Sequence, residues 1–225
     1  TAVEYENWSL CDRLLPHAKI AASLVKDYQL DFEAAAFLLN QPGRYLSQRA
    51  QYREAESLIS QALELRRRLS EQENPDVAAS LTDLARVYRG QGRNQEAEPL
   101  YKQALEIRRQ KLGEEHSEVA TSLYNLARLY YNQARYEEAE AFHLQALDLR
   151  RLQLDDGDKE DNIDVADSLN SLAQLYEAQG KYGDAEPLYQ EALTLRQDFL
   201  GENHPDVATS IDNLAGIYEA QGRYS

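Results

Sequence analysis

The feature that most constrains the fold of this 225-residue chain is an internal repeat of about 42 residues. Four segments align, and the valines that they share stand 42, 46 and 42 residues apart, at Val77, Val119, Val165 and Val207. A more divergent copy precedes them, and the four extra residues of the longer interval are expected in the loop around 154–162. A period of this length is typical of stacked supersecondary units, each of which buries its apolar face only against its neighbours.

Each copy is predicted to form two amphipathic helices joined by a tight turn. Apolar residues recur at spacings of three and four, in one first helix at Leu81, Leu84, Ala85 and Tyr88. Three copies place a glycine where a left-handed residue ends a helix, at Gly92, Gly180 and Gly222. Ala134 takes this place in another copy, at an expected cost of about 1 kcal/mol. Pro42 falls in the middle of a predicted first helix and is expected to bend it.

The residues of this pattern resemble a known family. Leu-Ala-x-x-Tyr, then an alanine seven residues into a second helix and then Ala-Leu, resembles the tetratricopeptide repeat (TPR). The 42-residue unit, with His-Pro-Asp-Val-Ala and Ala-Glu-Pro-Leu-Tyr, is similar to the longer variety found in kinesin light chains. The resemblance covers 32–225 and implies an all-α, right-handed superhelix of antiparallel helix pairs. These pairs are expected at 32–74, 75–116, 117–162 and 163–204, with an unfinished half-pair at 205–225.

The first 31 residues lack the repeat and are predicted to form an N-terminal capping helix. They resemble the segment that joins an NB-ARC-type nucleotide-binding switch to its repeats, on the residues Trp8, Cys11, Leu14, Leu15, Pro16 and His17. That resemblance would make the repeats the sensor region of a larger signalling protein. The alternative is that Trp8, Leu14 and Leu15 only cover the apolar face of the first pair. The chain contains no GxxxxGK[ST] phosphate-binding motif.

The charge of the chain argues against two classes of partner. With 39 acidic and 24 basic residues the formal net charge is −15, which disfavours nucleic acid and anionic lipid because both are bound through Lys and Arg. Cys11 is the only cysteine, so no intrachain disulfide can form. A reducing, cytoplasmic location is the simpler interpretation.

The side chains that catalysis or metal binding requires are scattered. His116 and His204 hold equivalent positions between repeats, where a helix cap or a loop contact is expected, and His143 replaces a core tyrosine. One cysteine excludes a clustered Cys/His zinc site. The acidic run 155–164 lacks the ligand spacing of an EF-hand loop. The sequence therefore predicts no enzyme, no metal site and no cofactor.

By resemblance to the family, the first helices line a concave groove that binds an extended peptide. The repeat positions of Thr82, Asp83, Arg86 and Arg89 define four columns that are expected to face it. The candidate peptide-binding residues are Asn40, Gln41, Arg44, Thr82, Asp83, Arg86, Arg89, Tyr124, Asn125, Arg128, Tyr131, Asn170, Gln174 and Asn213. Amides suit this role because they both donate to and accept from a peptide backbone of any sequence.

The charges in these columns change sign along the chain. Arginines stand in the early repeats, at Arg44, Arg86, Arg89 and Arg128, whereas acidic residues stand in the later ones, at Glu177, Asp212 and Glu219. This pattern predicts a non-catalytic module that binds an extended, acidic segment of a protein partner.

Three other interpretations concern structure alone. In the first, the groove arginines only pair with neighbours such as Asp83. In the second, the chain is a structural or self-associating scaffold that forms homo-oligomers through the exposed half-pair. The third concerns the arginine pairs late in the second helices, which are interpreted as structural because cations favour helix C-termini: Arg66/Arg67, Arg108/Arg109 and Arg150/Arg151.

Overall fold

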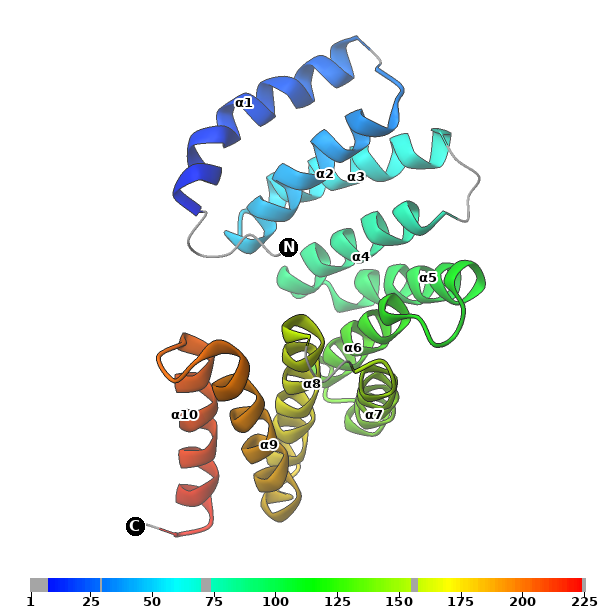
Figure 1. Cartoon of the computed structure of the whole chain (residues 1–225). Coiled ribbons are helices and arrows are strands. Elements are labelled where there is room, and N and C mark those ends of the chain that lie inside the picture. The colour runs from blue at the N-terminus through cyan, green and yellow to red at the C-terminus, as the bar shows by residue number, and fades with distance from the viewer. Residues whose placement is uncertain (1–7, 29, 70–73, 155–157, 224–225) are drawn as a thin grey trace. The chain divides into compact units, whose positions relative to one another are not determined.

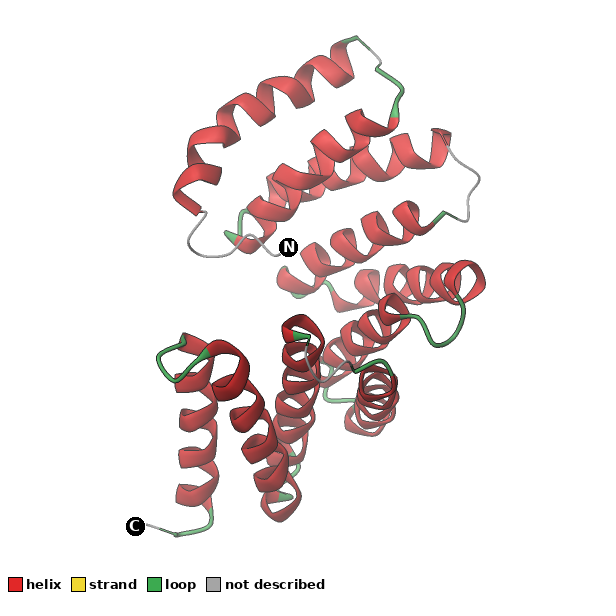
Figure 2. Cartoon of the chain, viewed as in Figure 1, coloured by secondary structure: helices red, strands yellow, loops and turns green. Residues whose placement is uncertain are grey.

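The computed structural model describes residues 8–28, 30–69, 74–154 and 158–223. Within these ranges every regular element is a helix (Figures 1 and 2). In chain order they are α1 (Trp8–Asp27), α2 (Glu33–Gln48), α3 (Tyr52–Leu69), α4 (Pro75–Gly90), α5 (Asn94–Leu112), α6 (Ser117–Asn132), α7 (Tyr136–Leu152), α8 (Lys159–Ala178), α9 (Tyr182–Leu200) and α10 (Pro205–Ala220). The predicted all-α fold is confirmed.

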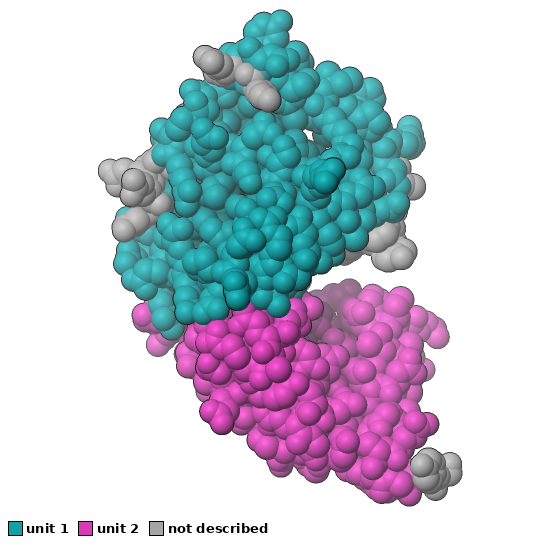
Figure 3. Space-filling view, turned by 180° about the vertical axis from the view of Figure 1, so that it is seen from behind, with its two compact units in different colours: residues 1–113 teal, residues 114–225 magenta. Residues whose placement is uncertain are grey.

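Short connections fold successive helices into four hairpins, α2–α3, α4–α5, α6–α7 and α8–α9. The connection between α4 and α5 is only three residues, 91–93, so these two helices run antiparallel and pack against each other. Helix α10 stands at the position of a further first helix. The chain divides into two compact units, residues 1–113 with α1–α5 and residues 114–225 with α6–α10 (Figure 3). The right-handed superhelical course of the whole chain stays a prediction.

Alanines allow the helices of each hairpin to approach closely. In unit 1 the side chains of Ala78, Ala85, Ala97 and Ala104 are fully buried, and so are their counterparts in unit 2, Ala120, Ala127, Ala139 and Ala146. Branched and aromatic residues fill the remaining space, among them Ile59 and Leu81 in unit 1 and Tyr189 and Ile217 in unit 2. Because these interiors are close-packed, the small residues set the distance between the helices.

The turn inside each hairpin has the same backbone in every copy. Gly92, Gly180 and Gly222 have φ of 75°, 73° and 69°, as predicted for residues that end a helix in the left-handed conformation. Ala134 adopts φ of 57°, so the expected strain of a Cβ in this conformation is present. Ala50 of the divergent copy does the same, with φ of 56°.

Four of the first helices, α4, α6, α8 and α10, begin at residues whose side chains cap them, whereas α2 begins at Phe32 without such a cap. The side chains of Asn74 and Asp158 accept hydrogen bonds from backbone N–H groups of α4 and α8. The Nδ1 atoms of His116 and His204 accept from the N–H groups of residues 118 and 206, each at 3.2 Å. The predicted capping role of these two histidines is confirmed.

The four inserted residues lengthen a helix. Helix α8 has 20 residues, whereas α4, α6 and α10 each have 16. The prediction that all four lie in a loop is wrong, and the expected boundary at 162/163 falls inside α8. Four residues make about one helical turn, so the insertion preserves the buried face of the helix. Asp158 and the acidic residues Glu160 and Asp161 stabilise the added turn at the positive end of the helix dipole.

The beginning of unit 1 departs most from the repeat. Helix α2 continues through Pro42, which is buried inside it. Helix α1 packs on α2 through Ala22 and Val25, as expected for a capping helix. Leu14, in contrast, is 53% exposed, so the prediction that it covers the first pair is wrong. The side chain of Trp8 lies outside the residues that the structure describes.

Candidate functional site

The four predicted columns lie on the first helices, and we call the surface that they form in each unit the first-helix face. In the columns of Thr82 and Asp83, five of the predicted residues expose less than a tenth of their surface: Asn40, Thr82, Asp83, Asn125 and Asn170. The remaining predicted residues, which include three members of the same two columns, are half-buried or exposed: Gln41, Tyr124 and Asn213 of these columns, and Arg44, Arg86, Arg89, Arg128, Tyr131 and Gln174 of the other two.

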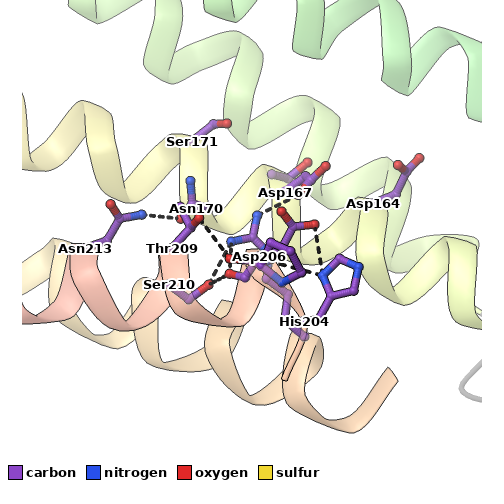
Figure 4. Close-up of polar contacts among 12 residues, drawn as sticks. Asp164, Asp167, Asn170, Ser171, His204, Asp206, Thr209, Ser210 and Asn213 are labelled. Carbon is purple, nitrogen blue, oxygen red and sulfur yellow. Dashed lines mark hydrogen bonds and ion pairs between the residues drawn. The ribbon is translucent and has the colours of Figure 1, made fainter. Parts of the chain in front are cut away.

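Hydrogen bonds connect residues of the Thr82 and Asp83 columns on neighbouring first helices. In unit 1, Asn40 Nδ2 donates to Asp83 Oδ2 at 2.8 Å. In unit 2, Asn213 Nδ2 donates to Asn170 Oδ1 at 2.8 Å (Figure 4). The hydroxyl of Tyr124 lies 3.1 Å from that of Ser171. These amides therefore connect one repeat to the next. The peptide-binding role predicted for them would use amide groups that already form hydrogen bonds between repeats.

Asp83 organises the basic part of the face in unit 1. Its Oδ1 atom lies 3.7 Å from Arg44 Nε and 3.6 Å from Arg86 Nη1, while its other oxygen accepts from Asn40. The Asp83 side chain is 9% exposed, whereas those of Arg44 and Arg86 are 36% and 39% exposed. The three side chains together carry one net positive charge. At this exposure each ion pair contributes about 0–1 kcal/mol of stability.

In unit 2, two arginine side chains lie over the aromatic ring of Tyr124. The guanidinium carbons of Arg150 and Arg128 lie 4.7 and 5.7 Å from its ring centroid. The His143 ring meets the Tyr124 ring edge-on, with the centroids 5.8 Å apart. Burial, with smaller contributions from the charges of Arg128 and Arg150, lowers the pKa of His143 to about 4. His143 is thus a neutral, packed residue at neutral pH, as its place in a core column predicts.

The fourth column, the repeat position of Arg89, forms a hydrogen bond with a core residue in unit 2. Burial raises the pKa of Tyr189, and the hydrogen bond that its hydroxyl donates to Glu177 Oε2 at 2.7 Å raises it further. Tyr131 is half-buried, and its pKa is raised by burial and by the neighbouring Tyr136 and Glu177. Glu177, which was expected to contribute acidic charge to the groove, is therefore also a hydrogen-bond partner of the hairpin interior.

The arginines late in the second helices form a further periodic set of polar residues, and only some of them and none of their contacts were predicted from the sequence. The arginines late in the second helices are buried, at Arg66, Arg108, Arg150 and Arg196. Arg66 donates to Ser80 Oγ at 2.6 Å, Arg150 to Ser168 at 2.6 Å and Arg196 to Ser210 at 2.7 Å. Each also donates to a backbone carbonyl in the same first helix, that of residue 76, 164 or 206.

The structural role of Arg66 and Arg150 is as predicted, but the reason given from the helix dipole is incomplete, and Arg196 was not among the predicted pairs. Each of these three arginines fastens a second helix to the next first helix. The sequence did contain a signal for this, because an arginine precedes a serine by 14 residues in the first and fourth copies and by 18 across the insertion. Among the residues that the structure describes, no three His, Cys, Asp or Glu side chains are placed to hold a metal ion.

The shallow hollow between α1 and α3, about 240 Å³, is lined by Lys19, Glu54 and aliphatic or small polar residues. It brings together no nucleophile, base and orienting group of the kind that catalysis requires. No described helix is long and apolar enough to cross a membrane.

Comparison with known proteins agrees with the periodic contacts described above. The family model of the tetratricopeptide repeat matches residues 33–110, 76–151 and 164–225, which is most of the chain. The chain is a tetratricopeptide repeat protein. TPR domains are in general protein–protein interaction modules and are typically non-catalytic. Among curated proteins, no sequence matches this TPR chain.

Solved structures similar to this TPR protein include several of the kinesin-light-chain type. BtubC (BKLC) from P. vanneervenii is 26% identical, with a TM-score of 0.72 over 99% of this chain and 85% of that one. TPR-like repeats from Podosopora anserina with a kinesin light chain designation are also 26% identical, with a TM-score of 0.70 over 86% of this chain and 90% of that one.

A more distant similarity shows the fold alone. The apo form of RapI is 17% identical, with a TM-score of 0.68 over 84% of this chain and 65% of that one. The resemblance to kinesin light chain repeats is confirmed. The expected link to an NB-ARC-type switch finds no support in these comparisons.

Proposed function

We propose that this TPR protein is a non-catalytic module that binds an extended, acidic segment of a protein partner along its first helices. The arrangement of Arg44 and Arg86 on the buried carboxylate of Asp83 is the observation that carries this proposal. A guanidinium has five N–H donors, and each of these two approaches Asp83 with one nitrogen. Donors therefore remain for a carboxylate, which an arginine binds in a forked geometry.

Holding the two arginines in place also favours binding. A long side chain loses conformational freedom when it is immobilised against a ligand, about 0.5–1.5 kcal/mol for each. Here Asp83 restrains both guanidinium groups before a ligand arrives, and Asn40 restrains Asp83. The exposed Arg128 and Gln174 hold the same column in unit 2 and are proposed as ligand contacts of the first-helix face of that unit. The single cysteine favours a reducing compartment such as the cytoplasm.

Selection from a random peptide library displayed on phage tests the proposal. We expect the wild-type chain to enrich peptides rich in Asp and Glu. Those peptides should bind the Arg44→Glu/Arg86→Glu variant at least about tenfold more weakly, because charge reversal repels them. The control is Arg53→Glu/Arg67→Glu, which makes the same charge change at exposed positions of α3. Enrichment without acidic preference, or equal binding by both variants, would contradict the proposal.

A structural or self-associating scaffold is the second candidate. Ile211 on α10 is 49% exposed and Ala208 is also exposed, whereas the equivalent Leu81 and Ala78 are fully buried by a second helix. An apolar surface of this kind favours association. The variant Ile211→Glu should lower self-association if this surface is used, and it should leave peptide binding through Arg44 and Arg86 unchanged.

A further inference from the structure

Helix α1 is apolar on two faces, only one of which is covered within unit 1. One face packs on α2 through Ala22 and Val25, which are 5% and 7% exposed. The other exposes large apolar side chains, Leu10, Leu14, Leu24 and Tyr28, at 49%, 53%, 44% and 72%. Tyr28 follows the last residue of α1, and its N–H still donates to the carbonyl of Leu24, so it continues the helix. We call these four residues, with the intervening His17 and Ala21, the α1 stripe.

The spacing of the α1 stripe is that of a helix–helix seam. Its six positions, 10, 14, 17, 21, 24 and 28, are separated alternately by four and three residues. A repeat of this kind keeps one side of a helix against a partner helix along its whole length. With 20 residues, α1 is about 30 Å long, so the stripe extends over several turns.

The α1 stripe is also symmetric about its own centre. Positions 10 and 28, 14 and 24, and 17 and 21 lie at equal distances on either side of position 19. Two antiparallel copies would therefore place Leu10 against Tyr28 and Leu14 against Leu24 twice each. A surface that meets an identical copy across a two-fold axis has to be self-complementary in this way.

The charges beside the stripe are also arranged symmetrically, about position 20, one residue from the centre of the stripe. Arg13 lies seven residues before Ile20 and Asp27 lies seven residues after it, so all three follow one edge of the stripe. Antiparallel pairing would bring Arg13 of each copy to Asp27 of the other. Neither forms an ion pair with a charge elsewhere in the described residues. Two other charges of α1 contact their own unit: Asp12 accepts from Tyr45 at 2.6 Å, and Lys19 pairs with Glu54.

From this pattern we infer that α1 is a homodimerisation surface, on which two copies of the chain pair antiparallel along the α1 stripe. The apolar layers supply the attraction, and the two Arg13–Asp27 pairs select the antiparallel orientation over the parallel one. This inference goes beyond the proposed peptide binding and does not depend on it, because α1 carries none of the first-helix residues.

Sedimentation of the full chain at protein concentrations up to about 100 µM tests the pairing, since a single helix seam is at the small end of specific interfaces. We expect a monomer–dimer equilibrium in the wild type. Arg13→Asp and Asp27→Arg should each weaken it by about tenfold, because each places like charges together twice. The double variant Arg13→Asp/Asp27→Arg should restore the dimer, and an equimolar mixture of the two single variants should form heterodimers.

Two further variants locate the surface. Leu24→Glu should abolish the dimer, whereas Leu144→Glu, at an exposed leucine of α7, should leave it intact. Leu10→Ala/Leu24→Ala provides the same test if the charged variant unfolds α1. A monomer at every concentration, a double variant that fails to restore association, or a dimer that is lost with Ile211→Glu and kept with Leu24→Glu would overturn the inference.

Discussion

The first and fourth helix pairs share one backbone plan but reach it with different residues. In the fourth pair, α8–α9, a leucine occupies the middle of the first helix, a glycine ends it, and Ala173 faces Tyr189 in the core. In the first pair, α2–α3, proline, alanine, glycine and isoleucine stand at these positions: Pro42, Ala50, Gly43 and Ile59.

One substitution compensates another in the first pair. A Cβ atom on Gly43 would lie 2.6 Å from Ile59 Cγ1, so the glycine provides the space that the branched isoleucine needs. The buried arginine, in contrast, is present in both pairs and makes the same contact with a serine of the next first helix, Arg66 with Ser80 and Arg196 with Ser210. The turn and core positions therefore tolerate exchange of residues, whereas the arginine–serine contact between successive pairs is maintained.

The largest effect is expected from removing that common contact. Arg66→Ala and Arg196→Ala should each cost about 2–4 kcal/mol, because they leave a serine and a backbone carbonyl without a charged donor. Urea unfolding measures the first, and hydrogen exchange of α10 measures the second. The neighbouring exposed Arg67→Ala is the control and should cost less than about 1 kcal/mol. Equal losses at Arg66 and Arg67 would show that the buried contact is unimportant.

The third pair, α6–α7, differs from the fourth at a core position, because His143 stands at the position of Tyr189. Its pKa is lowered to about 4 in the folded state, from an ordinary value of 6.5. The unfolded chain therefore binds a proton first, so stability present above pH 6.5 should fall as the pH drops toward 4, by about 3 kcal/mol.

His143→Phe should remove that part of the pH dependence, which urea unfolding at pH 7 and pH 4.5 will measure. Tyr189→Phe in the fourth pair is the control, since its target does not titrate in this range. If the His143→Phe chain loses as much stability as the wild type on acidification, the buried histidine is not responsible.

A smaller loss of stability is expected from substitutions at Gly43 and Ile59. Gly43→Ala should cost about 1–3 kcal/mol by overpacking against Ile59. In the Ile59→Ala background the same change should cost less, so the two sites should couple in a double-mutant cycle of thermal unfolding. Additive costs would argue that Gly43 does not serve to accommodate Ile59.

The smallest effect concerns the turns. Ala50→Gly and Ala134→Gly should each stabilise the chain by up to about 1 kcal/mol, because they relieve a left-handed alanine. Gly180→Ala is the reciprocal control and should destabilise it by a similar amount. Thermal unfolding of the three variants is sufficient, and a loss of stability in the two glycine variants would refute the explanation.

Much of the fold could be predicted from residues that act locally. The spacing of Leu81, Leu84 and Ala85 defines a buried helix face, and Gly92 ends that helix in the conformation that a glycine favours. The insertion was misplaced because four residues can extend either a loop or a helix, and the cap at Asp158 decides for the helix.

The candidate site was less predictable. Pairing of the groove arginines with Asp83 was one of the interpretations of the sequence, and Arg86 lies only three residues from it. The contact of Arg44 with Asp83 and the burial of Asn40, in contrast, depend on a residue about 40 positions away. A periodic sequence shows which residues share a column. It does not show which columns are close enough to form hydrogen bonds.

The sequence alone thus determined the helical pairs, their turns and the membership of the TPR family, since these follow from spacing within about 40 residues. The burial of individual polar residues and the partner that each one contacts are visible only in the folded chain. Arg66, Arg150 and Arg196 became contacts between successive pairs, and the apolar Leu14 became exposed. The physical reason is that burial and pairing depend on the packing of one repeat on the next, which spacing within a repeat does not specify.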